Sequence, residues 1–129
     1  MNIINGGAHA NNELRIQEFM IRPDKAKTFS EAVRMCFIVI NNLRKLIKKL
    51  GHSTSVGDEG GFAPMISNNE NALKLIVKAI NLSGFRNGID ISICLDVAAN
   101  ELIKKNLYSI HSKTYISVDK SISQYLKLI

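Results

Sequence analysis

The stretch Gly57-Asp58-Glu59-Gly60-Gly61-Phe62-Ala63-Pro64 joins two segments with strong helical patterns and carries two adjacent carboxylates between glycines. Glycine on both sides lets the backbone take positive φ values and lets another group approach closely. A plain connection between helices needs neither the acids nor this glycine content. Taken alone, the stretch could still be an acidic surface turn, so its interpretation depends on the segments that accompany it.

Three other segments place polar side chains inside or beside apolar runs. His9 follows the run 2–7, Gln17 and Glu18 interrupt the run 16–21, and Asp96 ends the run 92–96. Burying such side chains costs free energy unless they are paired or used. Together with Glu59, these residues are expected to meet at the ends of separate elements as a candidate site.

Two helices are well marked between these segments. The first has the capping box Thr28-Phe29-Ser30-Glu31 and the stop Gly51, and the second has the capping box Ser67-Asn68-Asn69-Glu70 and ends before Gly84. The predicted apolar stripe of the first helix consists of Phe29, Ala32, Val33, Cys36, Phe37, Ile40, Leu43, Ile47 and Leu50. The predicted order is strand, strand, helix, helix, strand, a short segment containing Tyr108, and a helix from about Val118.

Composition fits a soluble part of one globular domain. The chain has 129 residues with 46% hydrophobic content, and it has neither a membrane-spanning apolar run nor a signal-peptide pattern. Cys36 and Cys94 match no metal or redox spacing and are interpreted as reduced core thiols. These features favour a cytoplasmic protein without a membrane partner.

The basic balance, a net charge of +6, raises the question of an acidic partner. Arg34, Lys45, Lys48 and Lys49 lie opposite the apolar stripe of the first helix, without an aromatic platform for bases. A solvated helix face explains them better than nucleic-acid binding does.

Five motifs in this chain resemble the enolase family, the glycolytic phosphopyruvate hydratases. They are NIINGGAHANN, IQEFMI, AKTFSEAVRM, VGDEGGFAP and LDVAA, in the family's order and close to its spacing. The resemblance runs to about Tyr108 and continues more faintly through a last helix. It implies an α/β fold: a truncated TIM-type barrel of parallel strands over residues 1–129, with a ββαα opening followed by a βα unit. The amino-terminal enolase domain and the later barrel strands are not represented.

The resemblance also implies roles for the candidate residues. Glu59 matches the family's proton donor and Glu18 its partner, and Glu18 also matches a substrate contact, as do His9 and Gln17. Asp96 matches the first of three carboxylate ligands of Mg²⁺, a cation that prefers hard oxygen ligands. The other two ligands and the lysine base come from later strands. From the residues alone, Asp96 could instead cap the following helical turn and His9 could be a satisfied core histidine. His52 and His111 match no motif and are interpreted as surface residues.

The implied reaction is the Mg²⁺-dependent dehydration of 2-phosphoglycerate to phosphoenolpyruvate. The segment Asn100-Glu101-Leu102-Ile103 departs from the family's pattern, and the chain alone is expected to be inactive. It is interpreted either as a fragment of a split or decaying gene or as one part of an enzyme completed by complementary enolase fragments. The alternative is a non-catalytic interaction module that reuses the fold's surface.

Overall fold

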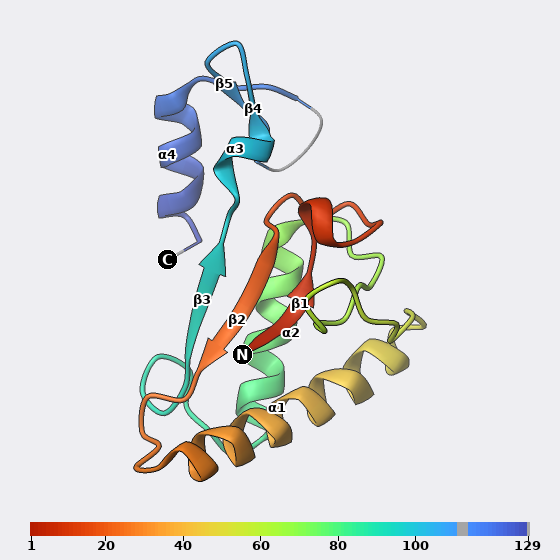
Figure 1. Cartoon of the computed structure of the whole chain (residues 1–129), viewed down its shortest axis with the longest axis vertical. Coiled ribbons are helices and arrows are strands. Elements are labelled where there is room, and N and C mark those ends of the chain that lie inside the picture. The colour runs from red at the N-terminus through yellow and green to blue at the C-terminus, as the bar shows by residue number, and fades with distance from the viewer. Residues whose placement is uncertain (111–113, 129) are drawn as a thin grey trace.

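The computed structural model describes residues 1–110 and 114–128, so the prediction for His111 lies outside the described residues. Five strands, four α-helices and one 3-10 helix follow one another along this part of the chain (Figure 1). They are β1 (Asn2–Asn5), η1 (Gly7–His9), β2 (Glu18–Arg22), α1 (Phe29–Lys49), α2 (Asn69–Leu82), β3 (Ser92–Asp96), α3 (Ala99–Leu102), β4 (Ile103–Lys104), β5 (Leu107–Tyr108) and α4 (Val118–Leu126). The predicted element order is confirmed, with β4 and β5 forming the Tyr108 segment.

The main sheet has the strand order β1-β2-β3, and β2 runs antiparallel to both neighbours. The expectation of parallel neighbouring strands was therefore wrong here. For β1 and β2 the reason is local, because residues 6–17 contain only a 3-10 turn and parallel neighbours are usually joined by a crossover helix. The start of β2 consequently lies level with the ends of β1 and β3, as the pairs Asn5–Glu18 and Glu18–Asp96 show.

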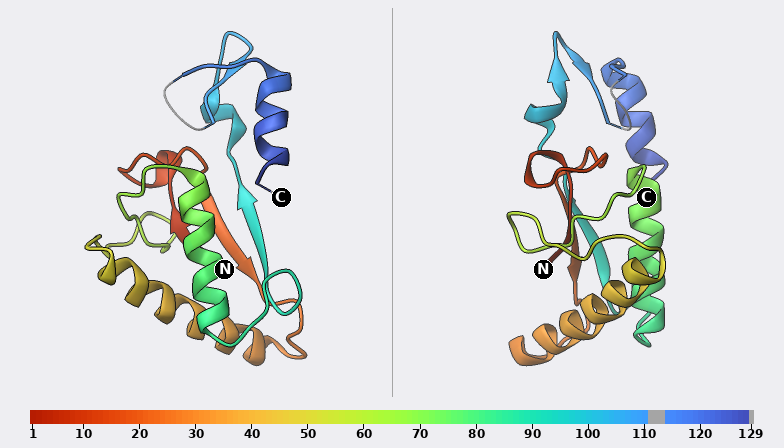
Figure 2. Two further views of the ribbon diagram at one scale, coloured as in Figure 1. Left: turned by 180° about the vertical axis from the view of Figure 1, so that it is seen from behind. Right: turned by 90° about the vertical axis from the view of Figure 1, so that its right-hand side faces the viewer.

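The fold is mixed α/β, and its strands do not close into a barrel among the described residues. Helices α2 and α4 lie on one side of the sheet (Figure 2). Phe19 and Ile21 of β2 are fully buried with Ile76 and Ile80 of α2, whereas Met20 and Cys94, which pair across β2 and β3, are only half-buried. One sheet face therefore carries the core, and the side chains named on the other face are only half-buried.

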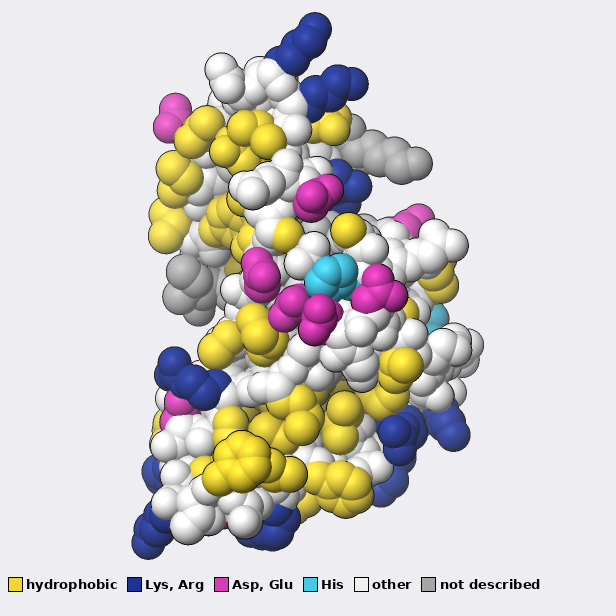
Figure 3. All heavy atoms as spheres, viewed as in Figure 1, with side chains coloured by type: hydrophobic (Ala, Val, Ile, Leu, Met, Phe, Trp, Pro, Cys, Tyr) yellow, Lys and Arg dark blue, Asp and Glu magenta, His cyan; other side chains and the backbone are white. Residues whose placement is uncertain are grey.

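The core-facing side of α1 differs from the predicted stripe. Cys36, Leu43 and Ile47 are buried as expected, but Phe29 is 84% exposed and Phe37 is 64% exposed. The side chains that replace them in the core are Met35, Val39 and Leu46. Because α1 is apolar on more than one side, periodicity alone did not determine which stripe faces α2. Figure 3 shows hydrophobic side chains at the surface in the lower part of the molecule, where α1 runs in Figure 1.

The helix ends largely follow the predicted signals. Thr28 Oγ1 accepts a hydrogen bond from the Glu31 backbone N–H at 3.1 Å, and Gly51 follows α1 with a positive φ of 77°. The cap of α2 is shifted by one residue, because Asn68 rather than Ser67 accepts the backbone N–H of Asn71, at 2.8 Å.

Asp90 ties the two turns at the other end of the sheet from the candidate site. Its carboxylate pairs with Arg86 at 3.0 Å and with Lys25 at 3.1 Å. The hydrogen bond from the Arg86 guanidinium is the main cause that holds the pKa of this carboxyl far below its ordinary value. The turn before α1 is thereby joined to the turn that leads into β3.

We predict that a polypeptide of these 129 residues is marginally stable and self-associates. The outer edge of β3, the half-buried Met20 and Cys94, and the exposed Phe29 and Phe37 leave apolar surface and strand edge for association. Helices α1 and α2 should persist to higher temperature than the strands because their caps are local. Size-exclusion chromatography and circular dichroism melting would check this, and a sharply melting monomer would contradict it.

Candidate active site

The loop that carries Glu59 is fixed to the end of β1 by backbone hydrogen bonds. The Phe62 N–H donates to the Ile3 carbonyl at 2.9 Å, and the Asn5 N–H donates to the Phe62 carbonyl at 2.8 Å. These bonds pair Phe62 beside Ile4 as a short parallel bridge. The Phe62 ring is buried under the Arg44 guanidinium of α1, 5.4 Å from the ring centroid. The loop therefore joins the sheet as a short additional segment.

Glycines are required where this loop approaches its neighbours. A Cβ on Gly57 would lie 2.4 Å from the His9 carbonyl oxygen, and one on Gly61 would lie 2.3 Å from Asn5 Oδ1. Between them, Gly60 has a φ of 78°, which side chains disfavour. The Gly57 N–H closes the turn by donating to the Gly61 carbonyl at 2.8 Å. Glu59 is thus presented at the tip of a turn whose base cannot accept larger residues.

Glu18 is the first residue of β2. The segment before it is held by the buried side-chain amide of Asn69. Asn69 Oδ1 accepts the backbone N–H groups of Arg15 at 3.2 Å and Ile16 at 3.4 Å, and its Nδ2 donates to the Ile110 carbonyl at 2.8 Å. Because every polar atom of this amide is used, the start of α2 holds the approach to β2 firmly.

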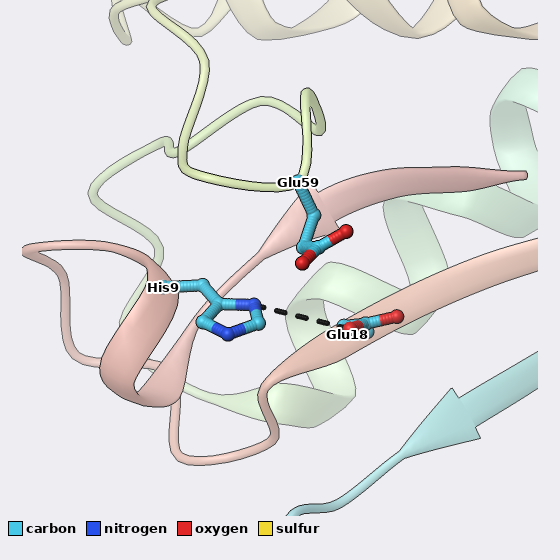
Figure 4. A group of neighbouring side chains, drawn as sticks. All are labelled: His9, Glu18 and Glu59. Atoms are coloured by element: carbon cyan, nitrogen blue, oxygen red, sulfur yellow. Dashed lines mark ion pairs between the residues drawn. The ribbon is translucent and has the colours of Figure 1, made fainter.

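His9, Glu18 and Glu59 converge from three different segments (Figure 4). One ligand atom from each lies within 4.8 Å of the others. His9 Nδ1 is 3.8 Å from Glu18 Oε1, and the two side chains are only 22% and 17% exposed. This spacing allows charge attraction but is longer than a hydrogen bond, and His9 Nδ1 is buried without a hydrogen-bond partner among the described residues. His9 Nδ1 therefore has a hydrogen-bonding position that no described protein atom fills.

Asp96 and Gln17 stand beside this cluster. Asp96 pairs with Glu18 across β2 and β3, is exposed, and accepts the Ala98 backbone N–H through Oδ1 at 3.0 Å. This bond stabilises the turn before α3 but is not a helix cap, because the N-cap of α3 has no side-chain hydrogen bond. Gln17 is half-buried, and its carbonyl accepts the Gly6 N–H at 2.9 Å. The structure therefore brings three predicted residues together and places the other two next to Glu18.

Negative charge is concentrated at this end of the sheet although the whole chain carries +6. Figure 3 shows Asp and Glu side chains gathered round a histidine on this face. Asp58 adds a further exposed carboxylate, and its backbone N–H donates to the His9 carbonyl at 3.2 Å. Several carboxylates in a small area give this end of the sheet a negative potential that favours a cation.

The donor set at this end fits part of a magnesium site. Mg²⁺ usually binds one or two carboxylates together with water and substrate oxygens. Asp96 offers an exposed carboxylate of this kind, next to Glu18 on the neighbouring strand. The group of His9, Glu18 and Glu59 includes an imidazole nitrogen, which suits Mg²⁺ less well. Asp96, Glu18 and Glu59 are therefore the residues here whose carboxylates have the chemistry of a magnesium ligand.

One residue of this site was missed by the sequence reasoning. Asn5 ends β1, is fully buried, and touches both Gly57 and Gly61. Its signal in the sequence was weak: an asparagine directly before a glycine pair at the end of an apolar run.

In this structure acidic side chains gather at one end of the sheet, and helices cover one of its faces. This arrangement is typical of α/β enzymes, whose working residues lie at strand ends. Comparison with protein families makes this specific, because residues 1–128 match the family model described as the C-terminal TIM barrel domain of enolase. The chain belongs to the enolase family.

A curated relative supports this membership and shows its extent. The chain is 78% identical over its whole length to a protein named enolase from Pelagibacter ubique (strain HTCC1062). It spans only 31% of the length of that relative. Across residues 1–110 and 114–128, no helix combines the length and apolar character needed to cross a bilayer.

We predict that Gly57→Ala detaches the acidic loop from β1. The added methyl group would overlap the His9 carbonyl and the Asn5 side chain, and overpacking of this kind costs about 1–3 kcal/mol. Hydrogen exchange at the Phe62 amide, measured by NMR, should become faster. Gly51→Ala is the control, because a Cβ there meets no atom within 4 Å and only its φ of 77° is strained. Equal protection of Phe62 in both variants would contradict the prediction.

Proposed function

We propose that this chain forms the part of an enolase active site that holds the acid pair. Residues 1–129 would act as a partial barrel domain, and the reaction would be the dehydration of 2-phosphoglycerate to phosphoenolpyruvate. The observation that carries the proposal is the convergence of Glu59 with Glu18 and His9. Family membership suggests the reaction, and the grouping of these three residues supports a role for them in its proton donation step.

The reaction removes a proton from the carbon next to a carboxylate and expels hydroxide from the neighbouring carbon. Hydroxide is a poor leaving group, so an acid must donate a proton to it as the carbon–oxygen bond breaks. Glu59 is exposed at the tip of its turn and would donate this proton, with the less exposed Glu18 as its partner.

His9 and Gln17 would contact the substrate. The His9 side chain is 22% exposed, and its Nδ1 has no hydrogen-bond partner in the described part of the chain. A substrate oxygen would be that partner. Gln17 precedes Glu18 directly, and its main chain is fixed to Gly6. Both residues border the acid pair and would orient the leaving hydroxyl group toward Glu59.

Asp96 would hold Mg²⁺ together with ligands from later strands of the family's barrel. The ion would supply positive charge to stabilise the negative charge that develops on the substrate. Asp96 would keep its bond to the Ala98 N–H, which fixes the carboxylate at the end of β3. The family's base also lies in the later strands, so we expect these 129 residues to need complementary segments for activity.

Our first functional prediction is that activity depends on Glu59 and on the complementary segments. The polypeptide alone should produce no Mg²⁺-dependent rise in phosphoenolpyruvate absorbance. Placed into the Pelagibacter relative over the region that it matches, the chain should give an active enzyme. There, Glu59→Gln should lower kcat by about 10²-fold or more with little change in KM, because a general acid acts mainly in the transition state.

Two outcomes would decide against this function. Full activity of the Glu59→Gln variant would remove Glu59 from the mechanism. An inactive but folded chimera would favour the non-catalytic interaction module, because the same segment would then fit the barrel without supporting the reaction. Asp58→Asn is a matched control that changes the neighbouring exposed carboxylate on the same turn.

A second functional prediction concerns Asp96. In the same chimera, Asp96→Asn should raise the Mg²⁺ concentration needed for half-maximal activity by about tenfold or more, because a neutral amide binds Mg²⁺ less strongly than a carboxylate does. Asp119→Asn, on α4, serves as the control for loss of one acidic charge. An unchanged Mg²⁺ requirement would leave Asp96 with its bond to the Ala98 N–H as its only role.

A further inference from the structure

Asn5 is a buried polar residue at the end of β1 that the proposed roles do not include. Its side chain is 0% exposed, and its backbone N–H and carbonyl are used by Phe62 and by Asn12 Nδ2 at 2.8 and 2.9 Å. The side-chain oxygen accepts Asn2 Nδ2 at 2.9 Å. Asn5 Nδ2 has no hydrogen-bond partner in the part of the chain that the structure describes.

The Asn5 side chain lies directly under the turn that presents Glu59. A Cβ on Gly61 would be 2.3 Å from Asn5 Oδ1, and a Cβ on Gly57 would be 2.9 Å from Asn5 Cβ. The amide therefore touches both ends of the segment 57–61. Its size sets how closely this segment approaches β1.

The same side chain is next to Glu18. Asn5 and Glu18 are register partners in β1 and β2, and directly opposite residues of an antiparallel pair point to the same face of the sheet. The amide is thus bordered by the strand that carries one acid and by the turn that carries the other. An unpaired buried N–H costs free energy, which a nearby acceptor would recover.

A second buried asparagine shows what a purely structural amide looks like in this fold. Asn69 is almost fully buried, and both its side-chain oxygen and its nitrogen have backbone partners. Asn5 differs because its donor has no partner among the described residues, and its register partner on β2 is the carboxylate residue Glu18.

We propose that Asn5 is a positioning residue of the acid pair. Its side chain packs against Gly57 and Gly61 and so fixes the position of the Glu59 turn. Its Nδ2 N–H donates to a carboxylate of the pair when substrate is bound. The inference rests on the proposed function and adds a residue to it. Asn5 packs against the Glu59 turn at Gly57 and Gly61, and in this proposal its amide acts on the acids rather than on the substrate.

The experiment uses the chain in the Pelagibacter chimera, with Asn5→Ala and Asn5→Ser compared with the parent. Asn5→Ala should lower kcat by about tenfold to 10²-fold while KM stays within about threefold, since misplacing a catalytic group by about 1 Å can cost 10²-fold. Asn5→Ser restores a hydroxyl donor and should recover part of kcat. Asn42→Ala is the control, because it breaks the 2.9 Å bond to Ser83 Oγ between α1 and α2, away from the site.

Thermal melting of each variant separates positioning from stability. We expect Asn42→Ala to lower the melting temperature with kcat within about twofold of the parent. If Asn5→Ala lowers only the melting temperature, or if Asn5→Ser has no higher kcat than Asn5→Ala, the proposal is overturned. If Asn5→Ala does not fold, Asn5→Ser decides: a reduced kcat with unchanged KM supports the proposal, and parental kcat overturns it. Failure of the proposed function is distinct, because Glu59→Gln would then leave kcat unchanged.

Discussion

The pairing of Phe62 with the end of β1 is the constraint on which the site depends. Two backbone hydrogen bonds hold Phe62 between Ile3 and Asn5, and the buried ring leaves little freedom for the preceding turn. Gly57 and Gly61 make this approach possible, since a Cβ at either position would overlap a neighbour. A loop of 19 residues between α1 and α2 (50–68) would otherwise have no reason to stay near β2. Glu59 of the loop lies near Glu18 of β2 because these bonds hold the loop backbone against β1.

The direction of β2 supplies the second half of the arrangement. Since β2 is antiparallel to both neighbours, its first residue, Glu18, lies level with the last residues of β1 and β3. Asn5, Glu18 and Asp96 therefore share one end of the sheet although they come from separate parts of the chain. A register shift of one residue would turn Glu18 toward the core and Phe19 toward the open face. The burial of Phe19 and Ile21 under α2 thus fixes the orientation of the carboxylate.

The sequence predicted the elements and the site residues better than it predicted their orientations. Caps such as Thr28 and stops such as Gly51 depend on local geometry, so the helix bounds were largely correct. Strand direction and the buried side of α1 depend on contacts with distant segments. Phe37 and Val39 are equally apolar, yet only Val39 faces α2. Asn5 was missed for a similar reason, because an asparagine before glycine is common in turns and only its burial reveals the contact with Gly57 and Gly61.

Buried polar atoms without a hydrogen-bond partner lower the stability of a fold. Among the described residues, three buried atoms without a partner, Asn2 Oδ1, Asn5 Nδ2 and His9 Nδ1, belong to the segment beside the Glu59 turn. Two others, Gln124 Oε1 and the Tyr125 hydroxyl oxygen, lie on α4. Elsewhere in the core a comparable amide, that of Asn69, is fully bonded. Buried atoms of this kind near the carboxylates and on α4 show that a missing partner alone does not mark a functional site. Water could complete any of these bonds because it both donates and accepts, whereas a cation could bind only the acceptor atoms.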